Sequence, residues 1–241
     1  MLIKTRGIIF KTFKYSETSV IAEVYTEEKG LRKYLISGVR SKKARVKASL
    51  LQHMSLVDLV AYEREDRDLH RIKEIKAAYV YQAIPFDLIK GTVGLFMVEV
   101  AQKTIREAEE NRELFQFLYD TFCYLDQTPH LAANLHLHYL LELSVFLGII
   151  PGGDFEKATP FFDLKEGLFV PDIPNHSHYV DEKNSALWYQ FLQTNRENCH
   201  LIRLGREERR VLLNQLLEYY QLHIESLPPI NAHQIIQQVI G

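Results

Sequence analysis

"SVIAEVYTEEKGLRKYLIS", Ser19 to Ser37, is the stretch that decides the fold class of this 241-residue chain. From residue 20 to residue 25, Val and Ala alternate with Ile, Glu and Tyr, and this period of two is typical of a strand with one buried face. After a turn at "TEEKG" comes a second run rich in residues that favour strands. The stretch therefore predicts two consecutive β-strands joined by a tight turn.

Three more runs of the same kind lie on either side of it, namely "GIIFKTFK", "SLVDLVAYE" and "LHRIKEIKAAYVY". Breaks separate the runs at "KYSET", in a basic stretch after Ser37 and at "REDRD". Five strands in about 75 residues suit a small closed barrel better than an open sheet, because closure leaves no edge strands unprotected. We predict a five-stranded OB-fold β-barrel over residues 1–81.

Beyond the barrel, the apolar period changes to that of helices. Apolar residues recur at spacings of three and four from Ile89 to Thr104 and from Leu114 to Leu125, and a third helix is expected from about Leu131 to Leu147. Two more helices are expected around Leu187 to Leu192 and Leu212 to Tyr220.

An irregular segment interrupts these helices at residues 152–180, where Pro, Gly, Asp and aromatic residues are frequent and "LKEG" favours a hairpin turn. The predicted fold class is therefore α+β. A five-stranded OB-fold barrel is followed by an all-helical domain, residues 82–241, which contains the irregular insertion.

Composition limits the classes of protein that the chain can belong to. It is 46% hydrophobic and 25% charged, which is typical of a globular protein with an ordinary core. The apolar stretch "YLLELSVFLGII" is interrupted by Glu142 and is shorter than the roughly 20 residues of a membrane span. Charges are scattered through the first residues, so a secretion signal is not expected and we predict a cytoplasmic protein. Cys123 and Cys199 form no CxxC pair and indicate neither a disulfide framework nor a cysteine zinc site.

Motifs of catalysis are missing from the sequence. It has no GxxxxGK[ST] phosphate loop, no GxSxG elbow and no HExxH metal motif. His136 and His138 are two residues apart on an expected helix, so their side chains diverge. His176 and His178 lie in a loop near two aspartates, where a metal site is geometrically possible but a solvated loop is the simpler interpretation. We therefore expect no enzyme, no catalytic residue, no metal and no cofactor.

Charge is divided unevenly along the chain. Residues 1–80 contain 17 Lys and Arg against 10 Asp and Glu, a formal net charge of +7, whereas the remaining residues contain 12 and 21, a net charge of -9. The interval from Lys29 to Lys47 holds eight of the basic residues and no acidic one. A basic module of this kind favours a polyanion as its partner.

A nucleic-acid interface is the sharpest interpretation of this interval, and a solvated loop that aids solubility is the simpler one. The first strand can approach the same groove of a small barrel, and exposed aromatic rings beside a basic groove are what single-strand binding requires. We expect Phe13, Tyr15, Tyr25 and Tyr34 to supply one or two such rings and otherwise to join the core. The predicted contacts are Lys11, Lys14, Arg32, Lys33, Arg40, Lys42, Lys43, Arg45 and Lys47.

The order of these segments resembles that of a known family. Several features follow one another in an order that resembles RecO proteins, the bacterial recombination mediators and DNA repair proteins. They are Gly7 with the apolar pair after it, Gly30 in the second turn, Gly38-Val39-Arg40 before the basic loop, "LLQHMSLVDL" and "LHLHYLLELSVFLGIIP". The resemblance covers about residues 2 to 151.

The resemblance implies an OB-fold and a helical domain that bind single- and double-stranded DNA and anneal complementary strands. It also implies work with RecR to load RecA onto DNA coated with the single-strand binding protein SSB, and contact with the acidic C-terminal tail of SSB. The activity would then take place on the nucleoid. Cationic candidates for the SSB tail in the helical part are Lys90, Lys103, Arg106 and Arg112.

One region departs from the family. Many RecO proteins have four cysteines of a zinc site after the third helix, whereas residues 152–180 contain no cysteine. We therefore expect no structural zinc. In its place we predict a small apolar core made by Phe161, Phe162, Leu164, Leu168 and Phe169.

Two alternatives stay open at this point. The chain could be an RNA-binding OB module, or an interaction scaffold whose basic loop docks an acidic protein tail without binding any nucleic acid.

Overall fold

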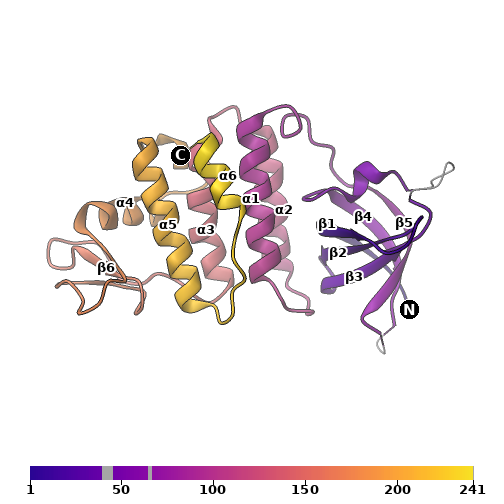
Figure 1. Cartoon of the computed structure of the whole chain (residues 1–241), viewed down its shortest axis with the longest axis horizontal. Coiled ribbons are helices and arrows are strands. Elements are labelled where there is room, and N and C mark those ends of the chain that lie inside the picture. Colours follow the sequence, from indigo (N-terminus) through magenta and orange to yellow (C-terminus); the bar gives the residue numbers. More distant parts are fainter. Residues whose placement is uncertain (40–45, 65–66, 241) are drawn as a thin grey trace. The chain divides into compact units, whose positions relative to one another are not determined.

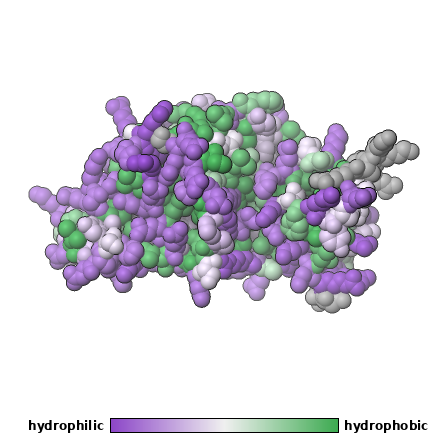
Figure 2. Space-filling view, in the orientation of Figure 1, coloured by the Kyte–Doolittle hydropathy of each residue, from purple (hydrophilic) through white to green (hydrophobic). Residues whose placement is uncertain are grey.

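The computed structural model describes residues 1–39, 46–64 and 67–240. The chain forms two compact units, one of Met1–Asp87 with Val98–Gln127 and the other of Leu88–Met97 with Thr128–Gly241. Hydrophilic and hydrophobic residues are interspersed on the face drawn in Figure 2. None of the helices in the described ranges combines the length and the apolar character needed to cross a bilayer.

Five strands close into a barrel in the first unit, as the alternating pattern predicts (Figure 1). They pair in the order β1-β2-β3-β5-β4, with β3 and β5 parallel and the other neighbours antiparallel. This arrangement confirms the predicted OB-fold barrel. The strands are β1 (Leu2–Lys14), β2 (Val20–Thr26), β3 (Gly30–Ile36), β4 (Leu56–Tyr62) and β5 (Leu69–Ala77), with a 3-10 helix at Ala48–Leu51.

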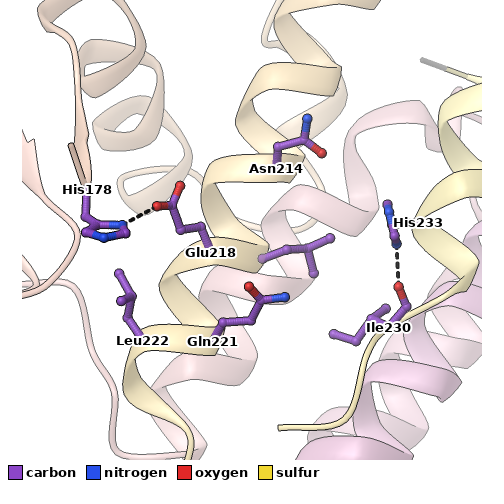
Figure 3. A pocket seen from close by; sticks show the side chains of 8 residues that line it. His178, Asn214, Glu218, Gln221, Leu222, Ile230 and His233 are labelled. Carbon is purple, nitrogen blue, oxygen red and sulfur yellow. Dashed lines mark hydrogen bonds and ion pairs between the residues drawn. The ribbon is translucent and has the colours of Figure 1, made fainter.

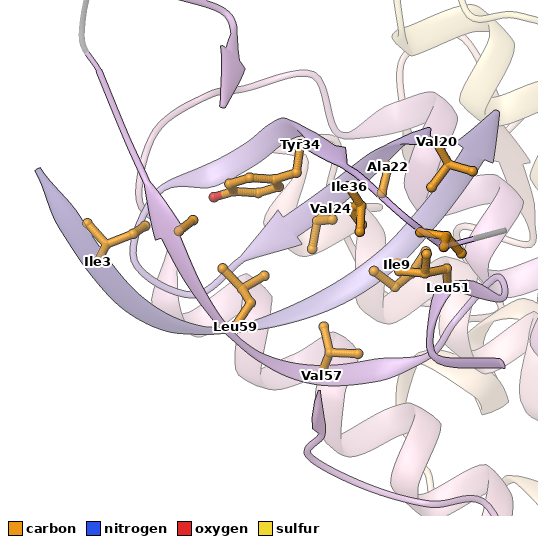
Figure 4. Close-up of a cluster of buried hydrophobic side chains, with 12 residues drawn as sticks. Ile3, Ile9, Val20, Ala22, Val24, Tyr34, Ile36, Leu51, Val57 and Leu59 are labelled. Carbon is orange, nitrogen blue, oxygen red and sulfur yellow. The ribbon is translucent and has the colours of Figure 1, made fainter. Parts of the chain in front are cut away.

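The barrel interior is filled by the alternate residues that the pattern assigned to one face. Figure 4 shows these side chains converging from β1 to β4, among them Val24 and Leu59, which are almost fully buried. A Cβ atom added at Gly7 would lie 2.6 Å from a methyl carbon of Val24, so glycine lets β1 pack closely on the interior. Tyr34 is also fully buried, and its hydroxyl donates a hydrogen bond to Glu63 (2.7 Å). Of the four aromatic candidates, Tyr34 therefore belongs to the core.

Tyr25 is buried for a different reason. It points outward from β2, but its ring stacks on Phe10 at a centroid distance of 5.6 Å and contacts Phe115 of α2 (Arg112–Gln127) at 6.2 Å. Only 1% of Tyr25 is exposed as a result. The strand pattern places this side chain on the outer face correctly, but that part of the outer face is covered by a helix.

Arg6 fastens the same helix to the barrel. Its guanidinium donates two hydrogen bonds to Glu27 (2.9 and 2.7 Å) and one to Gln116 of α2 (2.9 Å). The guanidinium carbon also lies 4.8 Å from the ring centre of Tyr119, a cation–π distance. The hydrogen bonds to Glu27 and its charge raise the pKa of Arg6, and the same hydrogen bonds lower the pKa of Glu27, so both groups are ionised at neutral pH.

Helices make up most of the rest of the chain, and a three-stranded sheet in the order β7-β6-β8 forms the irregular segment. The hairpin between β6 and β7 turns where "LKEG" predicts it. The short helix α6 has no counterpart among the predicted elements. The remaining elements are α1 (Leu88–Thr104), α3 (Leu135–Phe146), β6 (Phe161–Asp163), β7 (Leu168–Val170), β8 (Tyr179–Val180), α4 (Glu182–Leu192), α5 (Arg206–His223) and α6 (Ala232–Val239), with 3-10 helices at Ala132–Asn134 and Cys199–Leu201.

An aromatic cluster forms the core of this small sheet. Phe162 is fully buried and pairs with Phe169 across the hairpin. Its ring centre lies 4.8 Å from that of Trp188 in α4. Leu168 is 47% exposed and Phe161 is half-buried, so their predicted place in the core is wrong. Successive strand residues face opposite sides of a sheet. Phe161 and Leu168 each directly precede a phenylalanine that points inward, so they face outward.

The connection from β5 to α1 is held by one carboxylate at the end of α2. Asp126 accepts hydrogen bonds from the backbone N–H groups of Gln82, Ala83 and Ile84 and from the hydroxyl of Tyr79. Burial would raise the pKa of Asp126, but these hydrogen bonds outweigh it and hold the pKa below its usual value. The carboxylate is therefore ionised at neutral pH and fixes the turn that leaves the barrel.

We expect Asp126→Ala to lower the free energy of unfolding by about 2–3 kcal/mol, because one buried and two partly buried N–H groups lose a charged acceptor. The wild-type advantage should be present above the ordinary carboxyl pKa and should be lost as the pH falls below about 4, since the folded-state pKa is depressed. Urea denaturation at a series of pH values measures both effects. Asp120→Ala, an exposed change on the same helix, is the control and should cost no more than about 0.5 kcal/mol. Equal losses for the two variants would contradict the assigned role of Asp126.

Candidate nucleic-acid interface

Two of the predicted contacts lie on either side of one glutamate on the outer face of the barrel. Lys11 of β1 and Lys33 of β3 are both in register with Glu23 of β2, which lies between them. Residues directly opposite one another in neighbouring strands point to the same face of a sheet. Both lysines are exposed, and neither forms an ion pair with another described residue.

A row of mostly apolar and aromatic side chains runs beside these lysines. Phe13, Ile21 and Leu35 are in register across β1, β2 and β3, and the row continues to Arg71 of β5 and Tyr62 of β4. Phe13 is 39% exposed and Tyr62 is 53% exposed. This part of the outer face therefore combines cations with accessible apolar and aromatic surface.

Three adjoining hollows along β3 and β5 form what we call the basic groove. Their volumes are about 820, 570 and 430 Å³. Arg67 lines all three hollows, Asp68 lines the first and the third, and Arg71 lines the second and the third. Glu63 and Asp68 are the acidic residues among the described ones that line it. The cationic side chains of the basic groove are Lys29, Arg32, Lys33, Arg64, Arg67, Arg71 and Arg106.

Arg32 is partly engaged within the barrel. Its Nε lies 4.0 Å from a carboxylate oxygen of Glu63, and one of its terminal nitrogens donates to the carbonyl oxygen of Leu31 (3.0 Å). Glu63 is 9% exposed and also accepts the Tyr34 hydroxyl. Burial raises the pKa of Tyr34, and the bond to Glu63 raises it further, so the hydroxyl remains a donor. A phosphate in the groove would share Arg32 with this carboxylate.

Two other predicted contacts, Lys14 and Lys47, do not line the basic groove. Lys14 is exposed at the end of β1, and Lys47 is exposed just before the 3-10 helix at Ala48–Leu51. The remaining four, Arg40, Lys42, Lys43 and Arg45, lie outside the described residues. The structure therefore brings Arg32 and Lys33 into one hollow and Lys11 onto the neighbouring face.

Three arginines of the groove are not among the contacts predicted from the sequence. Arg64, Arg67 and Arg71 lie in and just after the turn between β4 and β5, where the sequence "REDRD" predicts only a break between strands. Alternating charges cancel in a count along the chain, so this turn shows no net basic charge in the sequence. The usable signal is the fold itself, because OB-fold barrels bind oligonucleotides with strands 2 and 3 and with the loops after strands 1 and 4.

Three of the four cations considered for a partner tail form contacts within the chain, and the fourth, Arg106, lines the basic groove. Lys90 is buried and donates to the carbonyl oxygen of Thr128 (2.7 Å), while Lys103 pairs with Glu99. Arg112 pairs with Glu28 (2.9 Å) and with a neighbouring glutamate. These contacts give all three side chains partners within the chain.

A further hollow in the second unit has the wrong charge for a polyanion. It has a volume of about 420 Å³ and lies between α5 and the segment before α6 (Figure 3). His178 and Glu218 pair across it at 2.6 Å, and none of the described residues that line it is a lysine or an arginine.

The residues of the second unit do not fit a structural zinc. His176 pairs with Asp163 (3.3 Å), separately from the His178–Glu218 pair, and no group of three or more potential ligands converges anywhere in the described ranges. Burial raises the pKa of Cys199 to about 12, so that thiol does not ionise to a metal-binding thiolate at neutral pH. His136 is fully buried, and burial lowers its pKa to about 3, which keeps the ring neutral.

Comparison with known proteins gives a consistent result over the whole chain. A family model described as Recombination protein O N terminal matches residues 1–81, and one described as Recombination protein O C terminal matches residues 85–230. Similar curated proteins include the DNA repair protein RecO of Bacteroides fragilis, 37% identical over 240 residues and 99% of both chains. The proteins of the same name from Phocaeicola vulgatus and Christiangramia forsetii are 32% and 34% identical over the full length of both chains.

Zinc content is the direct check on the small sheet. We expect purified protein to contain far less than one zinc per chain and its melting temperature to be unchanged by EDTA, because the Phe162 cluster stabilises the sheet without a metal. A structural zinc would contribute on the order of 10 kcal/mol to folding, so chelation would then unfold the region. Elemental analysis together with thermal unfolding decides this, and stoichiometric zinc would refute the prediction.

Proposed function

The chain belongs to the RecO family of DNA repair proteins, and from this membership we propose that it is a recombination mediator that anneals complementary DNA strands. It binds single- and double-stranded DNA on the nucleoid without any bond-making chemistry. With RecR it helps to load RecA onto DNA coated with SSB, and it contacts the acidic tail of SSB.

The basic groove is the observation that supports DNA binding most directly. It places seven lysine and arginine side chains along one open side of an OB-fold barrel. Each DNA phosphate is negatively charged, and lysine or arginine side chains that neutralise phosphates release condensed counterions. The groove supplies this sequence-independent attraction.

Strand annealing follows from the same electrostatics. Two complementary strands repel one another, and a surface that neutralises part of their charge lowers the free energy of bringing them together. Such a role needs cations and open space rather than a nucleophile or a metal. Double strands can be held by the same phosphate contacts, because these carry no information about the bases.

The test is a salt series of single-stranded oligonucleotide binding measured by fluorescence anisotropy. We expect the variant with Arg64, Arg67 and Arg71 all changed to Ala to lose roughly 0.7 in the log-log salt slope for each phosphate contact removed, about 2 in total. Circular dichroism confirms that the variant is folded. An unchanged slope would exclude the basic groove as the binding surface.

Two further variants sharpen this test. Changing Lys42, Lys43, Arg45 and Lys47 to Ala measures the basic loop separately and should lower the slope by up to about 3 if all four side chains contact phosphates. Changing Lys157, Lys165 and Arg206 removes the same charge as the groove variant from exposed positions in the second unit. We expect this control to bind as the wild type does. A loss equal to that of the groove variant would show that only net charge matters.

A further inference from the structure

Two exposed tyrosines stand on either side of one arginine in the basic groove. Tyr15 and Arg71 line one hollow, and Tyr62 and Arg71 line the next. Tyr15 is 58% exposed and Tyr62 is 53% exposed. Neither hydroxyl is hydrogen-bonded to another described residue. Tyrosine rings that are exposed beside a guanidinium offer apolar area that a ligand can cover.

The barrel holds both tyrosines in defined positions. Tyr15 directly follows β1, in a turn closed by hydrogen bonds from the N–H groups of Tyr15 and Ser16 to the carbonyl oxygen of Ser19 (3.0 and 3.1 Å). Tyr62 is the last residue of β4 and is in register with Arg71 of β5. The rings are therefore attached to strand ends rather than to a long loop.

An aromatic ring next to a guanidinium matches the two parts of a nucleotide. A base can stack on the ring while the guanidinium contacts the neighbouring phosphate, and such stacking tolerates any sequence because every base has a π face. In a duplex the base faces are already stacked on one another, so the rings gain nothing from double-stranded DNA. Aromatic residues in the basic groove therefore distinguish strands that phosphate contacts alone treat alike.

We propose that Tyr15 and Tyr62 are a base-stacking pair, placed on either side of Arg71, and that the pair makes the protein bind single-stranded DNA more tightly than double-stranded DNA. This inference rests on the proposed function, since it assumes that DNA occupies the basic groove. It adds a specificity determinant to a surface whose other contacts are to phosphates. The pair holds exposed bases of one strand, and the contact ends when those bases join a duplex.

The test compares Tyr15→Ala, Tyr62→Ala and the double variant with the wild-type full-length protein. The probes are an oligo-dT of about 16 nucleotides, the upper site size of an OB-fold, and a duplex of the same length. We expect each substitution to weaken single-strand binding by between about 5-fold and 100-fold, which corresponds to the measured range for the loss of one stacked base. Duplex affinity and the salt slope should be unchanged, because no charge is removed.

Three controls separate stacking from other effects. Tyr15→Phe and Tyr62→Phe keep the rings and should restore single-strand binding. Phe86→Ala removes an aromatic side chain that is 87% exposed and does not line the basic groove, and it should have no effect. Fluorescence of a 2-aminopurine base in the oligonucleotide should be quenched on binding to the wild type and less so on binding to the double variant.

The possible outcomes distinguish failure of the stacking pair from failure of the proposed function. Wild-type protein that binds both DNA forms, together with alanine variants that keep full single-strand affinity or lose both forms equally, would overturn the stacking pair alone. Wild-type protein that binds neither form would overturn the proposed function, and the stacking pair with it.

Discussion

The contact between α2 and the barrel determines which surface of the first unit is open to a ligand. Arg6 forms hydrogen bonds with Glu27 and Gln116 and lies over the Tyr119 ring, and Tyr25 is buried between Phe10 and Phe115. Tyr25 would otherwise face water, but it is buried between the barrel and α2. The outer face between β3 and β5 remains open, and the cations of the basic groove lie there. The position of the helix therefore explains the position of the candidate site.

Carboxylates within and beside the basic groove limit how strongly its cations can bind a polyanion. Glu63 lies 4.0 Å from Arg32 and holds the Tyr34 hydroxyl, and Glu23 stands between Lys11 and Lys33. On the proposed function, an incoming phosphate competes with these groups for the same cations. This competition lowers the affinity for DNA. A limited affinity suits a protein that must bring strands together and then release the product. The near-neutral net charge of the whole chain is consistent with this balance.

The strands and helices can be predicted from the sequence more fully than the candidate site. Alternation over residues 19–37 defines β2 and β3, because strand geometry imposes a period of two on any half-buried strand. The groove depends instead on parallel pairing of β3 with β5, which sets Lys33 beside Leu69 and Leu35 beside Arg71. No local pattern reports a pairing between residues 36 positions apart. The same limit applies to Tyr25, whose burial depends on a helix some 90 residues away in the chain.

Hydrogen exchange of the full-length protein, with and without a saturating single-stranded oligonucleotide, tests the central claim that DNA occupies the open face of the barrel. The account predicts slower exchange in peptides that cover β3, the turn between β4 and β5, and the first half of β5, with no change in α5. Protection confined to residues 128–240, with unaltered exchange in the barrel, would contradict it.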